Sequence, residues 1–242
     1  MEISLDSFSV SNRHVKLELK TAWVFLVLAA LVILAVGEFT HIDLLIEDFY
    51  YDPVLKTFPW KHTWFAEDLM HIYVKNGLMA CACLLYAVLA IDLFKPWRGL
   101  NPGLRFKLRF VAIASVVIPI TVSILKQHSV LHCPWDIDRY HGAAPFIKLL
   151  DHIPGGMDAG ACFPAGHATT GLWLASLCVL WLPHHPKKAR LVFMAGLSVG
   201  FMLGWVQQMR GAHFLFHTLW SMWITSLIIL MMLQCANIPT SD

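Results

Sequence analysis

The stretch that decides the fold reads GACFPAGHATTGLWLASLCVLWL, residues 160–182. Its first eight residues form a turn rich in glycine and proline, and the run 168–182 is almost wholly apolar. Pro164 and Gly166 let the backbone bend tightly, so we expect His167 to stand where an apolar helix begins. The first N–H groups of a helix have no partner inside it and suit an anion such as phosphate.

The composition indicates that this helix lies in a membrane. Of the 242 residues, 57% are hydrophobic and 14% are charged, and the mean hydropathy is +0.61. Soluble domains are typically about 45–50% apolar. The net charge is +2, and no basic run points to a nucleic-acid partner.

Six apolar runs are candidates for membrane-spanning helices, because a helix needs roughly 20 residues to cross a bilayer and shorter runs extend into their flanks. The runs are 21–36, 77–94, 110–125, 168–182, 191–206 and 214–235. We therefore predict an all-α, polytopic membrane protein with six transmembrane helices. It is expected to form one domain over residues 1–242, with its motifs within about 115–225.

Basic residues gather in segments that alternate along the chain. They precede the first run and lie between the second and third and between the fourth and fifth runs, whereas acidic residues crowd the other loops. Because basic loops stay in the cytoplasm, we expect both termini there and the acidic loops on the periplasmic side of a bacterial inner membrane. The long aromatic loop 38–76 is expected to lie along the outer leaflet.

Polar residues with chemical potential lie in two more stretches on the acidic side. Lys126 ends the third run, and the segment 207–217 leads into the sixth. At 100° per residue, five polar side chains of this region fall within a third of a helix circumference: Gln207, Arg210, His213, His217 and Ser221. Such a stripe is costly in a membrane unless it forms a site or bonds neighbouring helices.

The chain resembles the type 2 phosphatidic acid phosphatase (PAP2) superfamily, integral-membrane relatives of the vanadium haloperoxidases. The first family motif is Lys, six residues, Arg-Pro. Lys126 and Pro134 match it, with Cys133 at the position of the arginine. The second motif, Pro-Ser-Gly-His, is matched by residues 164–167 with alanine in place of serine.

The third family motif is Ser-Arg, five residues, His, three residues, Asp. In the likeliest match by spacing, His213 is the histidine, Gln207 takes the position of the arginine, and His217 that of the aspartate. An alternative register makes His217 the nucleophile, with Arg210 and Ser221 near the arginine and aspartate positions. We favour His213, because a histidine one helical turn later can hold its imidazole in the right tautomer.

The resemblance implies phosphoryl transfer without a cofactor or metal. His213 would attack phosphorus to give a phosphohistidine, while His167 would protonate the departing oxygen and His217 would support the nucleophile. Because both family arginines are displaced, we expect other outer-facing arginines to replace them. The predicted phosphate-binding residues are Lys126, Arg139, Arg210, Gly166 and Gln207.

The resemblance also implies a lipid substrate, such as a phospholipid, a polyprenyl diphosphate or a lipid A phosphate, with water or a second lipid as the acceptor. Cys133 and Cys162 both fall on the predicted periplasmic side, and we predict a disulfide between them. Two other function classes stay open. The histidines and cysteines outside the spans are numerous enough for a zinc-dependent hydrolase, and a non-catalytic transporter is also conceivable.

Overall fold

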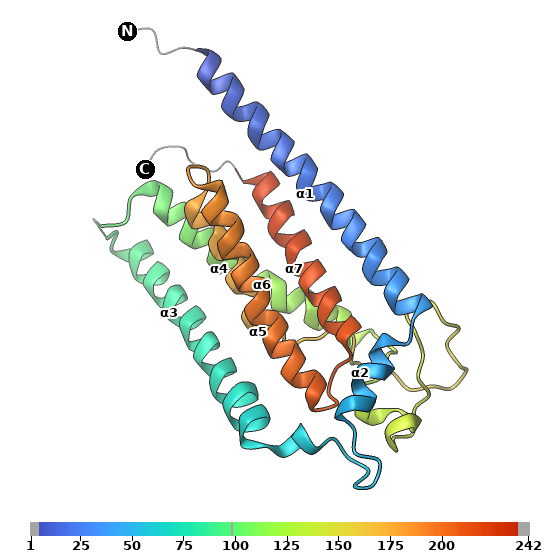
Figure 1. Ribbon diagram of the computed structural model, residues 1–242. Coiled ribbons are helices and arrows are strands. Elements are labelled where there is room, and N and C mark those ends of the chain that lie inside the picture. The colour runs from blue at the N-terminus through green and yellow to red at the C-terminus, as the bar shows by residue number, and fades with distance from the viewer. Residues whose placement is uncertain (1–4, 98, 237–242) are drawn as a thin grey trace.

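The computed structural model describes residues 5–97 and 99–236. Within these residues the chain is all-α, as predicted, and contains no β-strand (Figure 1). The chain ends, for which we expect a cytoplasmic location, lie outside the described residues.

Five helices of the described chain are long and apolar enough to cross a membrane. They are α1 (Leu5–Phe39), the continuous helix of η2 (Trp64–Val74) and α3 (Lys75–Phe94), α4 (Pro102–Gln127), α6 (Pro186–Met209) and α7 (Leu215–Cys235). Figure 1 shows them as a bundle with α1 beside α7 at one edge and α3 at the other.

The sixth predicted span, 168–182, is a shorter apolar helix, Thr169–Trp181. It begins as α5 (Thr169–Leu172) and continues as the 3₁₀ helix η5 (Trp173–Trp181). The expectation of six spans is therefore not confirmed, because five helices of the described chain have spanning length and the sixth run forms a shorter segment packed among them.

The expected outer loop, 38–76, is only partly a loop. It contains the short helices α2 (Ile42–Tyr50) and η1 (Pro59–His62), but from Trp64 onward it belongs to the second span. The Thr63 hydroxyl accepts a hydrogen bond from the N–H of Ala66 (3.3 Å), which caps this helix. The prediction of an interfacial loop is wrong for residues 64–76, because π-helical turns run directly into α3.

The segment α5–η5 lies inside the bundle, packed against α4 and α6. Two glycines of α6 allow this close approach. A β-carbon on Gly196 would stand 2.2 Å from the amide nitrogen of Ala175, and one on Gly200 would stand 2.2 Å from Cδ2 of Leu172. Small residues on α6 thus fix the position of the helix that follows the His167 turn.

One end of the bundle is covered by the long segment between α4 and α5. It includes the short 3₁₀ turns η3 (Pro134–Asp136) and η4 (Asp138–Tyr140). A small apolar cluster of Phe58, Ile137, Tyr140 and Phe214 joins this segment to η1 and to the start of α7. This covered end carries the polar residues singled out from the sequence.

The packing of α6 on η5 leads to a stability prediction. Gly196→Ala should lower the free energy of unfolding by about 1–3 kcal/mol, because the added methyl group meets backbone rather than a movable side chain. Gly77→Ala is the matched control, since a β-carbon there has no neighbour within 4 Å. Thermal unfolding in detergent measures both variants, and equal melting temperatures would contradict this packing.

Candidate active site

The turn before α5, residues 160–167, is held against the residues that directly follow α4. The N–H of Ala161 donates to the carbonyl of Ser129 (2.9 Å), and a disulfide joins Cys133 to Cys162. This is the pairing that the sequence predicts. The two cysteines are separated by 29 positions in the sequence. A disulfide that closes a loop of this length stabilises the folded state by roughly 3–4 kcal/mol in the chain-entropy model. The Cys133–Cys162 bond connects the first family motif to the second.

The same turn is attached to α7. The N–H of Ala165 donates to the carbonyl of His217 (3.1 Å), and the Ser221 hydroxyl donates to the carbonyl of Ala165 (3.0 Å). The next three amides, of residues 166–168, donate to no acceptor within the described chain. The second and third motifs therefore meet at a group of free N–H donors, which suits an anion.

Lys126 reaches this turn from the last turn of α4. A β-carbon on Gly166 would lie 3.8 Å from Cδ of Lys126, so the lysine side chain passes over the glycine. Gly166 thus leaves the lysine side chain room to lie against the backbone, and the positive charge of Lys126 acts on His213.

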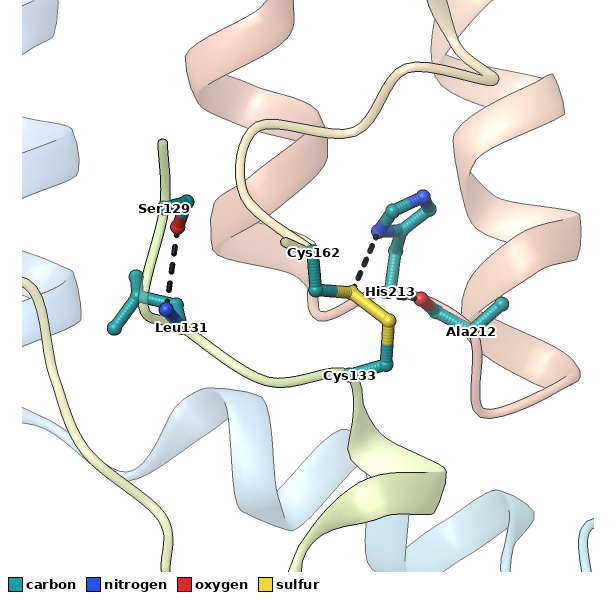
Figure 2. Close-up of a disulfide and its surroundings, with 6 residues drawn as sticks. All are labelled: Ser129, Leu131, Cys133, Cys162, Ala212 and His213. Atoms are coloured by element: carbon teal, nitrogen blue, oxygen red, sulfur yellow. Dashed lines mark hydrogen bonds between the residues drawn. A yellow bond between two sulfur atoms is a disulfide. The ribbon is translucent and has the colours of Figure 1, made fainter. Parts of the chain in front are cut away.

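The imidazole of His213 lies against the disulfide, as Figure 2 shows. Its Nδ1 is 3.4 Å from Sγ of Cys162, and the same sulfur lies 3.2 Å from the carbonyl oxygen of Ala212. A disulfide sulfur has no hydrogen to donate and is a weak acceptor, so this contact favours a proton on Nδ1 of His213. Nε2 then carries the free lone pair that a nucleophile needs.

His217 does not orient His213 in the expected way. The two rings are 5.8 Å apart with an angle of 68°, and within the described chain no hydrogen bond joins them. His217 instead packs between the rings of Phe163 and Phe214, at 5.5 and 5.4 Å. The sulfur of Cys162 lies beside Nδ1 of His213, where we expected His217 to lie.

The expected polar stripe on one helix is also wrong. The helix α6 ends at Met209, the chain turns through Gly211 with φ of 72°, and α7 begins only at Leu215. Glycine adopts this left-handed conformation without strain, so the turn breaks the periodicity. The side chains converge on the site from two helices and a turn.

Arg210 is buried and ties three segments together. Its guanidinium donates to the carbonyl of Lys61 (3.0 Å), to Oε1 of Gln207 (3.1 Å) and to Oε1 of Glu67 (3.5 Å). Three of its five N–H groups are used in this way, which leaves two for a substrate. Gln207 serves as a partner of this arginine.

Arg139 lies in a different environment. It forms a bidentate ion pair with Asp48 of α2, at 2.8 and 2.7 Å, and the Tyr140 hydroxyl donates to the same carboxylate at 3.1 Å. The carboxylate occupies the fork that a phosphate would need. We therefore remove Arg139 from the predicted phosphate site and assign it to the attachment of α2.

Comparison with protein families identifies the chain. A model described as the PAP2 superfamily matches residues 107–240. The chain belongs to the PAP2 superfamily. This superfamily generally comprises phosphatases and related phosphoesterases, so membership together with the five apolar helices indicates a membrane phosphatase. Searches of curated proteins and of solved structures give no match.

The surroundings of the candidate site lower the pKa values of His167 and His213. Burial lowers the pKa of His167 to about 3, with further lowering by His71, Lys75 and Arg210. Burial also holds the pKa of His213 well below its usual value, and the positive charge of Lys126 acts in the same direction. Both shifts have the same physical causes, which are burial of an ionisable group and positive charges nearby.

Two contributors to the candidate site were missed from the sequence. His71 of η2 stacks on His167, and Asp43 of α2 accepts a hydrogen bond from the N–H of Phe216 (3.1 Å) at the start of α7. His71 was hidden by the prediction that residues 38–76 form a loop. The i, i+4, i+8 spacing of Glu67, His71 and Lys75 was the available signal of a polar helix face.

The Asp43 contact leads to a pH prediction. Burial raises the pKa of Asp43 to about 6, although its N–H partners at the start of α7 and the charge of Lys148 lower it. Because the folded-state pKa is raised, the carboxyl contributes most stability below about pH 4, and that contribution is lost as the pH rises through about 6.

Asp43→Asn cannot titrate, so its melting temperature relative to the wild type should rise between pH 4 and pH 7. Asp138→Asn, at an exposed position, is the control. A difference between the wild type and Asp43→Asn that stays constant with pH would show that Asp43 is ionised throughout.

Proposed function

We propose that the protein is a lipid phosphatase that cleaves a phosphomonoester or diphosphate of a membrane lipid through a phosphohistidine on His213. The observation that carries this proposal is the meeting of the buried His213 and the half-buried His167 with Lys126 at a turn of unpaired amides. These are the parts that metal-free phosphoryl transfer requires: a nucleophile, an acid and donors for the developing charge.

In the first step, Nε2 of His213 forms a bond to phosphorus as the bond to the leaving oxygen breaks. Protonated His167 gives its proton to that oxygen, so the lipid leaves as a neutral alcohol or as a lipid monophosphate. In the second step, neutral His167 takes a proton from water, and the resulting hydroxide displaces His213. Lys126, Arg210 and the amides near Gly166 neutralise the non-bridging oxygens throughout.

His213 is the better nucleophile candidate than His217. Its Nδ1 is occupied by the contact with Cys162, so its Nε2 lone pair is free. His217 is 3% exposed, its Nδ1 has no partner within the described chain, and aromatic rings flank it. A packed ring of this kind supports the wall of the site.

A crevice beside the turn supports a lipid as the substrate. Its volume is about 500 Å³, and it extends along α7 from the end of α4. The lining is mainly apolar and includes Leu125, Val130, Phe163, Pro164, Trp220 and Trp223. Since Phe163 and Pro164 also belong to the turn, hydrocarbon chains in the crevice would place a phosphate beside His167.

The location of the charges supports a site on the outer face of the inner membrane. The helices α4 and α6 carry the basic residues of these segments mainly in their first turns, and both helices end at the site. The basic segments therefore lie at the far end of the bundle (Figure 1), which is the cytoplasmic end by the positive-inside rule. The same chemistry with a lipid hydroxyl in place of water would give a lipid phosphotransferase.

A zinc hydrolase is less consistent with the donor set. Among the described residues, one group of three potential ligands lies close enough to hold an ion: Cys133, Cys162 and His213. The two cysteines form a disulfide and have no thiolate to offer.

Trapping of the phosphoenzyme tests this proposal. Purified protein is incubated with ³²P-labelled phosphatidic acid, phosphatidylglycerophosphate, polyprenyl diphosphate or lipid A. The reaction is then quenched, and the acid-labile label on the protein is counted. His213→Ala should carry no label, and His217→Ala should retain slow labelling, because His213 makes the bond.

His167→Ala should accumulate label from a substrate with a good leaving group, since the activation of water is lost. The exposed His152→Ala is the control and should behave as the wild type. Label retained in His213→Ala and lost in His217→Ala would transfer the role of nucleophile to His217.

A further inference from the structure

A histidine reaches the site from outside the segment that matches the family. His71 lies on η2, which packs against α6, whereas the family match begins at residue 107. The ring of His71 is parallel to that of His167, with a centroid distance of 4.0 Å and an angle of 8°. At this separation a charge on one ring strongly affects the other.

Polar groups lie close to one side of each ring. The side chain of Gln207 interacts with His71, and the backbone of His71 interacts with His167. The remaining nitrogens, Nδ1 of His71 and Nε2 of His167, are buried and have no partner within the described residues. A buried nitrogen without a partner costs free energy, so these two mark the place where a proton or a substrate oxygen belongs.

We propose that His71 is a positioning residue for His167. Its ring and its carbonyl hold the His167 imidazole in the orientation for proton transfer, and the stacked pair accepts one proton between them. This inference rests on the proposed function, in which His167 is the acid.

The positive groups around the pair oppose its protonation, and Glu67 of the second span acts on His71 in the opposite sense. His71 and Lys75 face His167 from the second span, Arg210 from the end of α6, and His213 from the turn before α7. A phosphate group compensates these charges when it enters, and one proton then binds at Nε2 of His167. That proton moves to the leaving oxygen as the phosphorus–oxygen bond breaks, while His71 stays neutral.

The first experiment follows the ionisation of His167 and requires no turnover. The protein is labelled with ¹⁵N-histidine in detergent, the His167 signal is assigned by its loss in His167→Ala, and it is titrated in the wild type, His71→Ala and His71→Phe. Protonation of His167 should begin at a higher pH in both His71 variants. Tyr73→Ala, which changes an exposed ring on the same helix, should titrate as the wild type.

The second experiment compares two leaving groups, with dioctanoyl phosphatidic acid and p-nitrophenyl phosphate as substrates. His71→Ala should lose about 10–100-fold in kcat on the lipid, because a misdirected acid slows departure of a poor leaving group. The loss on p-nitrophenyl phosphate should be much smaller. His71→Phe keeps a flat ring against His167 and should recover most of the kcat on the lipid, while the shift in ionisation persists.

The outcomes separate this inference from the proposed function. The inference is overturned if His167 titrates as in the wild type in both His71 variants while their melting temperatures show folded protein. His71 would then have only a packing role. If the wild type instead forms no phosphohistidine with any lipid while the titration shifts as expected, the proposed function fails and the coupling of the two histidines stands.

Discussion

The hydrogen bond from the N–H of Ala165 to the carbonyl of His217 is the contact on which the site depends. It joins the turn before α5 to the first turn of α7, two segments far apart in the sequence. The disulfide fixes the same turn to the end of the first motif, and Ser221 fixes it to α7. With these attachments the amides of the turn cannot rotate toward other partners, so they stay available to an anion.

The site also has to satisfy the cost of burying polar groups in an apolar bundle. A charged imidazole is expensive there, and the cations nearby increase this cost, so His167 and His213 remain neutral. In the proposed mechanism a phosphate would relieve both penalties, because its negative charge would pair with Lys126 and allow His167 to take a proton. These penalties favour a mechanism based on charge.

Much of the fold could be predicted, because the apolar length of a helix is a local property. The run 110–125 lies within α4, and the run 214–235 nearly coincides with α7. The break between α6 and α7 was missed because helical periodicity was extended through Gly211, whose conformation depends on its surroundings. Local sequence likewise does not reveal that Arg139 pairs with Asp48, since the two residues are 91 positions apart.

The candidate site was predictable where the family motifs are local and failed where a contact replaced a motif residue. The turn with His167 follows from its local sequence, and the proximity of Lys126 to this turn was expected from the family motifs. The sulfur beside Nδ1 of His213 does not, because a disulfide acts there in place of a side chain four residues later in the chain. His71 was missed because residues 38–76 were predicted to form a loop, and its stacking on His167 is a contact between distant segments.

The central claim is that the phosphoryl group passes through a covalent bond to a histidine of the protein. The stereochemical course at phosphorus tests it most directly, with a substrate made chiral by oxygen isotopes and sulfur and with isotopically labelled water. Two successive in-line displacements each invert the configuration, so the account predicts overall retention. Overall inversion would show that water attacks phosphorus directly and would contradict the phosphohistidine mechanism.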